Sequence, residues 1–503
     1  MKKYLSLILG VLLFSSCGKF LEEFSQDLAY AQSCADLDEI LIGNGYMEQP
    51  LYFAKASVYG TGYYPYIHVM DDDVSMSIFG TGTDIINNLA SYKNFYDWSD
   101  QLTINPANDE EWEDKDWEKI YSHIGYLNVI IAHVNKFTRD SVEVRNRVEG
   151  EARFLRGAYY YLLTNLYANP YVKETAARDM GVPLNLTEDI EDKYYTRNSM
   201  EECYKVIVED LKAAADKLKG VKQSTIYRVN ELAARVLLSR VYLYMGEWQL
   251  ALDECQKAMA LDGIALVDLN TISDEEEEWS MLNTSNPEVL FTQGFSAVKT
   301  FYESIDWFTI CSFACSDELL SLYDRYRVQG VEDLRLNAFF LTEDEEHYRV
   351  NKGGENVYDC FVIRSAELYL NKAEAEAMLD KTEALSTIKA LLYKRFEGGK
   401  IPSIDGLQGK ELVSFIRDER RRELCFEAHR WFDLRRYAVS PKYPEKKSIT
   451  HETYDKNGIW EGNYVLKPYG EDPAWVLPIP GYEIVYNQGN LVDNPERESR
   501  KLE

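Results

Sequence analysis

Residues 412–437 read LVSFIRDERRRELCFEAHRWFDLRRY, and this stretch decides the fold. It contains no Gly or Pro, and most of its residues favour helices. Large apolar residues recur along it at helical spacing, at Leu412, Ile416, Leu424, Trp431 and Leu434. Seven Arg and five Asp or Glu fill other positions. A surface helix rarely combines large rings with so many charges, so the stretch predicts a single, largely buried helix whose arginines are paired with carboxylates.

The charges of this stretch allow two interpretations. They could form a catalytic or anion-binding cluster, or they could form an ion network that ties helices together. Several acids and arginines lie one helical turn apart, such as Glu419–Arg422, Arg420–Glu423 and Glu427–Arg430. We favour the ion network, because mutual pairing is the ordinary way in which charge is tolerated inside a protein.

The pattern E-R-x-x-E-L-x-F-E-x-x-R-W-x-D-L-x-R resembles the C-terminal signature of the SusD/RagB family of outer-membrane nutrient-binding lipoproteins. It falls on Glu419, Arg420, Glu423, Leu424, Phe426, Glu427, Arg430, Trp431, Asp433, Leu434 and Arg436. Ala428 departs from the pattern, since members of the family often carry Gly there. The family's closing P-I-P…N…N-P signature is matched by Pro478, Ile479, Pro480, Asn487, Asn494 and Pro495. The sequence EARFLRGAYYYLLTNLY at 151–167 also resembles an early helix of the family, and with the lipoprotein Cys17 the resemblance covers nearly the whole chain.

Composition narrows the functional classes. The chain has 503 residues, with 55 Lys and Arg against 84 Asp and Glu, a formal charge of −29. This balance argues against a general nucleic-acid binder, which needs a basic surface. The chain also holds 37 Tyr, 20 Phe and 9 Trp. Such a surplus of aromatic residues favours a surface that grips flat or amphipathic ligands.

The first residues form a targeting segment. Lys2 and Lys3 precede the apolar run 5–14, which is too short to span a bilayer. Ser15-Ser16-Cys17 then matches a lipoprotein cleavage site, so we expect a signal peptide over 1–16 and acylation of Cys17. Several acyl chains on one cysteine would anchor the protein firmly in a membrane. No later stretch of the sequence is apolar for long enough to cross one.

Helix pairs dominate the remaining chain, 17–503, which we expect to form a single domain. The clearest pair lies within 233–262, where the spacing of small and apolar residues matches a tetratricopeptide repeat: Leu238, Ser239, Tyr242, Gly246, Ala251, Cys255 and Ala258. We predict a mostly α fold, a tetratricopeptide-like scaffold with helix pairs within 112–261 and 364–437. Two large irregular insertions, 60–108 and 266–361, interrupt it, and we expect them to face the ligand.

The insertions supply the candidate binding residues. Five rings are predicted to stack on a ligand: Trp98, Tyr66, Trp279, Tyr302 and Trp307. Four polar residues near them are predicted to form hydrogen bonds with it: Asp72, Asp73, Asp100 and Asn283. Trp98 is the first choice, because acids flank it in an aperiodic stretch. For every one of these rings, packing in the core is an equally good explanation.

The sequence points to no catalytic or metal site. It contains no H-E-x-x-H, G-x-S-x-G or G-x-x-x-x-G-K pattern. The acidic run 274–278 lacks the alternating ligands and central Gly of a calcium loop. The cysteines after Cys17 are irregularly spaced and predict neither a zinc site nor a disulfide framework.

The family resemblance implies a binding role without a cofactor. It implies a lipoprotein on the outer face of the outer membrane that captures glycans and passes them to a SusC-like TonB-dependent transporter. Two other functions stay open. Tetratricopeptide character alone would favour a surface protein that binds peptides or proteins. A glycoside hydrolase needs only two suitably spaced carboxylates, and the chain has many acids.

Overall fold

The computed structural model describes residues 31–48, 63–76, 92–104, 111, 113–189, 191–272, 279–294, 296, 298, 313–342, 348–353, 356–455 and 459–503. The chain is about 48% helical, and its helices form tetratricopeptide-like antiparallel pairs, which confirms the expected fold class. Tyr302, Trp307, Cys17 and the acidic run 274–278 lie outside the described residues.

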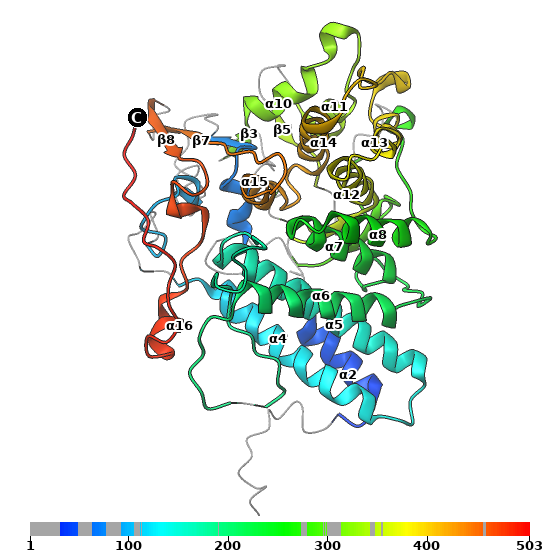
Figure 1. Ribbon diagram of the computed structural model, residues 1–503, viewed down its shortest axis with the longest axis vertical. Helices are drawn as coiled ribbons and strands as arrows, with labels where there is room; N and C mark the ends of the chain where they lie inside the picture. The colour runs from blue at the N-terminus through cyan, green and yellow to red at the C-terminus, as the bar shows by residue number, and fades with distance from the viewer. Residues whose placement is uncertain are drawn as a thin grey trace, which may run out of the picture.

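The first helices form the lower half of the view in Figure 1. They are α2 (Cys34–Ile40), α4 (Lys115–His133), α5 (Val142–Tyr167) and α6 (Met200–Lys217). Ser199 caps α6 in a capping box with Glu202, as a serine before an amphipathic run should. α5 packs against both α4 and α6.

The next helices continue the stack upward and to the right in Figure 1. They are α7 (Glu231–Tyr244), α8 (Trp248–Met259), α12 (Ser365–Met378) and α13 (Glu383–Leu392). Gly246 turns the chain between α7 and α8 with a φ of +70°, a conformation that glycine adopts without strain. α12 packs against α7, α8 and α13, so two helix pairs that are far apart in sequence form one layer.

The arginine-rich stretch folds into two helices, so the prediction of one continuous helix is wrong. α14 (Gly409–Leu424) ends before the bend, and α15 (Arg430–Ala438) begins after it. Phe426 and Ala428 between them both have a φ of +58°, which no right-handed helix can contain. The sequence showed no Gly or Pro at this point, and the bend was therefore missed.

Short elements complete the described chain. The strands pair two by two, all antiparallel: β1 (Val74–Met76) with β3 (Phe313–Cys315), β2 (Val289–Thr292) with β6 (Val362–Arg364), β4 (Phe340–Leu341) with β5 (Arg349–Val350), and β7 (Ile449–Tyr454) with β8 (Trp460–Leu466). The short helices are α10 (Asp317–Asp324), α11 (Arg335–Phe339) and α16 (Gly481–Tyr486). The remaining turns of helix are Leu41–Gly45, Pro65–Val69, Val134–Lys136, Leu269–Thr271, Arg327–Gln329, Glu397–Gly399 and Pro473–Trp475. The β1–β3 pair joins the two insertions to each other.

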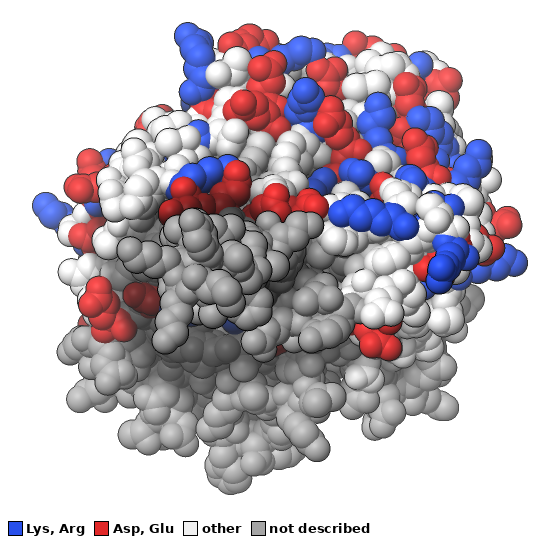
Figure 2. All heavy atoms as spheres, turned by 90° about the horizontal axis from the view of Figure 1, so that it is seen from below, with Lys and Arg blue, Asp and Glu red and all other residues white. Residues whose placement is uncertain are grey.

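Charges are mixed on the face seen from below. Lys and Arg lie interspersed with Asp and Glu over the described part of that face (Figure 2). This arrangement agrees with the composition, since a nucleic-acid surface would show a continuous basic area.

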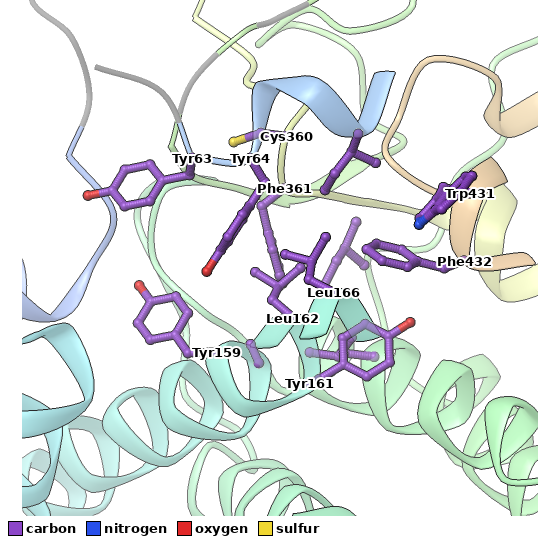
Figure 3. Packing of buried hydrophobic residues seen from close by; sticks show 14 of the residues in the cluster. Tyr63, Tyr64, Tyr159, Tyr161, Leu162, Leu166, Cys360, Phe361, Trp431 and Phe432 are labelled. Atoms are coloured by element: carbon purple, nitrogen blue, oxygen red, sulfur yellow. The ribbon is translucent and has the colours of Figure 1, made fainter. Parts of the chain in front are cut away.

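The core absorbs much of the aromatic surplus. Tyr159 and Tyr161 extend from α5, Tyr63 and Tyr64 come from the first insertion, and Trp431 lies in the first turn of α15 (Figure 3). All five side chains are buried. The aromatic count therefore reflects packing between the insertions and the scaffold, in addition to any binding surface.

Among the described residues, no helix has both the length and the apolar character needed to cross a membrane.

Candidate functional site

The signature charges of α14 form a buried ion network. Glu423 accepts hydrogen bonds from Arg395 at 2.9 and 3.0 Å, from Arg364 at 3.2 Å and from Arg335 at 3.3 Å. Glu288 bridges Arg364 and Arg395 at 2.9 and 2.7 Å. All five side chains are completely buried. The network joins β2, β6, α11 and the end of α13 to α14, which confirms the structural interpretation of these charges.

Of the three local pairs given as examples, one forms. Glu419 pairs with Arg422, as the spacing predicts. Arg420 instead pairs with Asp433 at 2.8 Å, and Glu427 pairs with Arg364 and Lys352. Arg364 and Lys352 come from distant parts of the chain, and Asp433 lies beyond the bend, so spacing within one helix could not reveal these partners.

Guanidinium groups keep the central carboxylates of this network ionised. Burial on its own raises the pKa of Glu423, but the positive charges of Arg395 and Arg364 outweigh it and hold that pKa well below its ordinary value. The same balance lowers the pKa of Glu419 and of Glu427. Such carboxylates are charge partners, and they are poorly suited to act as general acids near neutral pH.

A second ion cluster fastens the first insertion to the signature helices. Asp72 accepts two hydrogen bonds from Arg430, at 2.6 and 2.8 Å, and also binds Lys447. Asp73 accepts from Arg421 at 2.6 Å. Both acids are buried. The expectation that Asp72 and Asp73 bond a ligand is therefore corrected: both carboxylates are buried and paired with the protein's own cations.

Asp71, Asp72 and Asp73 lie close enough together for their carboxylates to share one metal ion. The cations Arg421, Arg430 and Lys447 already balance this cluster. Burial, together with the charges of Asp73 and Asp72, raises the pKa of Asp71 well above its ordinary value. The trio is therefore better explained as part of the ion cluster than as a metal site.

Two of the predicted stacking rings belong to the core. Trp98 is fully buried, lies against His451 at a ring distance of 4.2 Å, and donates its indole N–H to the Met70 carbonyl at 2.9 Å. Tyr66 is fully buried and stacks on Phe95, also at 4.2 Å. A ring enclosed in this way offers no face to a ligand, so Trp98 and Tyr66 are corrected to packing residues.

The other predicted residues lie apart from these rings. Asp100 is exposed and accepts a hydrogen bond from the Ser499 hydroxyl at 2.5 Å. Trp279 is half-buried and packs against the main core. Asn283 is half-buried, and its side-chain oxygen accepts from Ser285 at 2.9 and 3.1 Å. Within the described structure, no direct bond joins any two of Asp100, Trp279 and Asn283.

The β7–β8 hairpin provides a candidate surface that the sequence reasoning missed. It packs on the first insertion: the Tyr96 hydroxyl donates to the Glu452 carbonyl at 3.0 Å, and the Lys93 ammonium lies 4.9 Å from the centre of the Tyr464 ring. His451 lies inward, with its ring nitrogens 2.7 and 2.8 Å from the carbonyl oxygens of Tyr96 and Asp71. These contacts fix the hairpin to the first insertion, 60–108, which we expected to face the ligand.

The opposite side of the hairpin is open to solvent. β7 alternates buried and exposed residues, with Glu452 exposed and Tyr454 half-buried. Tyr454 is directly opposite Trp460, which is 53% exposed. Tyr454 donates its hydroxyl to Glu452 at 2.5 Å, and Asn463 follows on β8. Two neighbouring rings, a carboxylate and an amide form an open platform, which we call the hairpin platform. The alternation in ITHETY was the signal for it.

A small cleft lies elsewhere on the scaffold. It has a volume of about 80 Å³ and is lined by Tyr171, Tyr244, Trp248, Arg436 and Pro441, among others. Ligand pockets of drug-sized molecules usually measure about 300–1,000 Å³. This cleft is too small for an oligosaccharide, and the open hairpin platform is the better candidate surface.

Comparison with known proteins identifies the family. Residues 336–496 match the model described as the SusD family, and residues 57–243 match one described as "Starch-binding associating with outer membrane". The chain belongs to the SusD/RagB family. This SusD/RagB member is also 25% identical to SusD-like protein P2 of Formosa agariphila over 440 residues, 75% of this chain and 79% of that protein.

Solved structures agree with this SusD/RagB assignment at the level of the fold. A putative sugar binding protein from Bacteroides vulgatus superposes with a TM-score of 0.71 at 24% identity, covering 93% of this chain and 99% of that one. A SusD superfamily protein from Bacteroides thetaiotaomicron gives a TM-score of 0.69 at 22% identity, covering 92% and 100%. The likeness spans both the helix pairs and the insertions between them.

Proposed function

We propose that this SusD/RagB member is a lipoprotein of the outer-membrane surface that binds glycans and delivers them to a SusC-like TonB-dependent transporter. The observation that carries the proposal is the match of residues 57–243 to the starch-binding family model. The sugar-binding description of its structural relative from Bacteroides vulgatus adds support. The proposed attachment to the membrane is through acylation of Cys17.

The hairpin platform is the proposed contact for the glycan. A pyranose ring has apolar C–H faces that pack on aromatic rings, and its hydroxyls need polar partners. Tyr454 and Trp460 offer the rings, while Glu452 and Asn463 offer an acceptor and an amide. Asp100, Trp279 and Asn283, together with Tyr302 and Trp307 outside the described residues, stay predicted as further contacts.

Binding without hydrolysis is part of the proposal. A glycosidase needs one carboxylic acid with a raised pKa beside a second carboxylate, both reachable by the substrate. The buried acids of the signature network are instead held ionised by arginines, away from solvent. A protein that releases its cargo intact to a transporter has no need of such a pair.

The test is calorimetric titration of the chain from Gly18 onward against starch, a panel of plant and microbial oligosaccharides, and peptides. Glycan binding without new reducing ends supports the proposal. Accumulation of reducing ends would replace it with a hydrolase. Binding of peptides alone would favour the alternative raised by the tetratricopeptide-like pair α7–α8.

The hairpin platform has its own test within that titration. Trp460→Ala should weaken glycan binding by about 1–2 kcal/mol, roughly 5–30-fold. Tyr393→Ala is the matched control, because Tyr393 is comparably exposed but lies directly after α13. Equal affinity of the two variants and the wild type would remove the platform from the site while leaving glycan binding itself in place.

The anchor is tested separately. Cys17→Ala should move the protein from the membrane fraction to the soluble fraction, because the acylated side chain is lost. Continued recovery with the outer membrane, at the level of the wild type, would show that another feature holds it there.

A further inference from the structure

The rings of the hairpin platform lie beside acids that have no cationic partner. Glu452 is exposed on β7, directly opposite Asn463 of β8, and Tyr454 follows it on the same side of the strand. The Glu452 carboxylate accepts the Tyr454 hydroxyl and, within the described residues, forms no ion pair. Glu461, next to Trp460, is exposed as well. The open side of the hairpin therefore carries negative charge that the protein itself does not neutralise.

A further acid reaches the platform from the second insertion. β7 packs on β1, β1 pairs with β3, and α10 begins with Asp317 directly beyond β3 (Figure 1). Asp317 is exposed, and among the described residues it too lacks an ion pair. The hydrogen bond to Glu452, burial, and the charges of Glu452 and Asp317 raise the pKa of Tyr454 to about 12. The Tyr454 ring thus lies in the field of two carboxylates that come from different elements.

The cations beside the hairpin are bound by acids outside the platform. The pairs are Lys93 with Asp97, Lys447 with Asp72 and Glu318, and Arg500 with Asp472. Lys467 is exposed, but it follows the end of β8 that is about 20 Å along the strand from Trp460. Lys501 is exposed close to Glu503, an acid whose backbone is bonded to that of Asn463. The described charge around the platform rings is therefore net negative.

Aromatic rings next to unpaired carboxylates favour an ammonium group. The face of an indole or phenol ring attracts a cation, which strengthens binding roughly two- to fivefold at an exposed site. An exposed ion pair adds up to about fivefold. The same carboxylates repel a carboxylate or sulfate group on a ligand, and such repulsion is an effective source of specificity.

A neutral sugar would use only part of this surface. Its C–H face can pack on Trp460, and its hydroxyls can bond Asn463, whose amide both donates and accepts. The charge of Glu452 contributes little to such a contact, whereas an ammonium on the sugar would use the rings and the carboxylate together.

From these observations we propose that the hairpin platform selects glycans whose sugars carry free amino groups, with Glu452 as the residue that recognises the protonated amine. Tyr454 and Trp460 pack on the sugar while the ammonium lies beside the carboxylate. Glycans rich in carboxylate or sulfate are rejected. The inference rests on the proposed function, because that function puts a glycan on the platform, and it adds the chemical class of that glycan.

The test is calorimetric titration with three hexasaccharides that share one β-1,4-linked backbone: chitosan hexaose with free amines, neutral cellohexaose, and the corresponding hexamer of glucuronate. The titration is run at low salt and at a pH at which the sugar amine is protonated. Chitosan hexaose should bind about tenfold more tightly than cellohexaose, and the glucuronate hexamer should bind most weakly. Raising the salt from about 0.01 M to about 1 M should shrink the preference, because the screening length falls from about 30 Å to about 3 Å.

Glu452→Gln tests the assigned residue. Glutamine keeps the size and the hydrogen-bonding capacity of the side chain but removes its charge, so the ratio of the two affinities should fall towards one. Glu209→Gln is the matched control, because Glu209 is exposed in the middle of α6, and this variant should keep the wild-type ratio. Thermal unfolding of both variants, expected to match the wild type, verifies that they are folded.

The outcomes separate the inference from the proposed function. Chitosan hexaose that fails to bind the wild type, or binds no better than cellohexaose, overturns the inference, while binding of any other glycan of the panel leaves the proposed function intact. A preference that survives in Glu452→Gln overturns the role of Glu452. Binding of pentalysine without binding of chitosan hexaose would assign the platform to cationic peptides and overturn the glycan class. If no glycan binds at all, the proposed function fails and the inference fails with it.

Discussion

Removal of Glu423 should destabilise the protein more than the loss of a surface acid. This carboxylate receives hydrogen bonds from Arg335, Arg364 and Arg395, and none of the four side chains is exposed. Glu423→Ala leaves three buried cations short of one partner. Removing one member of a buried ion pair costs about 3–5 kcal/mol. Glu423→Gln keeps an acceptor but loses the charge, and should cost about 2 kcal/mol.

The assay is thermal unfolding followed by circular dichroism. For a chain of 503 residues the entropy of unfolding is about 1 kcal/mol per kelvin. Glu423→Ala should therefore lower Tm by about 3–5 °C. Glu209→Ala is the control, because Glu209 is exposed in the middle of α6, and it should change stability by at most about 0.5 kcal/mol. A Tm for Glu423→Ala within about 1 °C of the control would refute the account of the network.

Three further predictions concern other parts of the fold. Trp98→Ala should destabilise the protein by about 3–5 kcal/mol in denaturant titration, because the indole ring packs in the core. Glycan binding by the folded variant should not weaken. A loss of glycan affinity at unchanged stability would show that Trp98 contacts the ligand after all. Ala428→Gly should raise the free energy of unfolding by about 0.5–1 kcal/mol, because φ is +58° there; a loss of stability would show that the methyl group packs usefully. Burial lowers the pKa of His451 from 6.5 to about 4. Between these pH values the unfolded chain binds a proton at His451 and the folded chain does not, so the free energy of unfolding should fall as the pH drops from 6.5 to 4. His451→Gln should flatten that dependence on pH. An unchanged slope in His451→Gln would assign the acid sensitivity to other groups.

Helices with regular apolar spacing were predictable from the sequence. The cap at Ser199, the turn at Gly246 and the repeat around Ser239 all rest on contacts between residues close in sequence. The break between α14 and α15 was not predictable in the same way. Phe426 and Ala428 adopt left-handed backbone conformations that neither residue type favours, and the surrounding packing and ion pairs must supply the free energy for them.

The candidate site was harder to predict, because burial in an aperiodic segment leaves no local signal. Trp98 has acids beside it in sequence, yet its ring faces His451, which is more than three hundred residues away. The sequence shows no partner for Asp72, whereas the fold pairs its carboxylate with Arg430. No role was predicted for Trp460, although the alternation of β7 indicates a hairpin. Long-range partners decided each of these cases.

The central claim is that the open side of the β7–β8 hairpin holds the glycan while the helix scaffold positions it. Hydrogen exchange measured by mass spectrometry, with and without a saturating glycan from the titration panel, tests this claim most directly. The account predicts slower exchange in residues 449–466 and unchanged exchange in residues 481–494. Protection absent from 449–466 and found instead along α7 and α8 would contradict it.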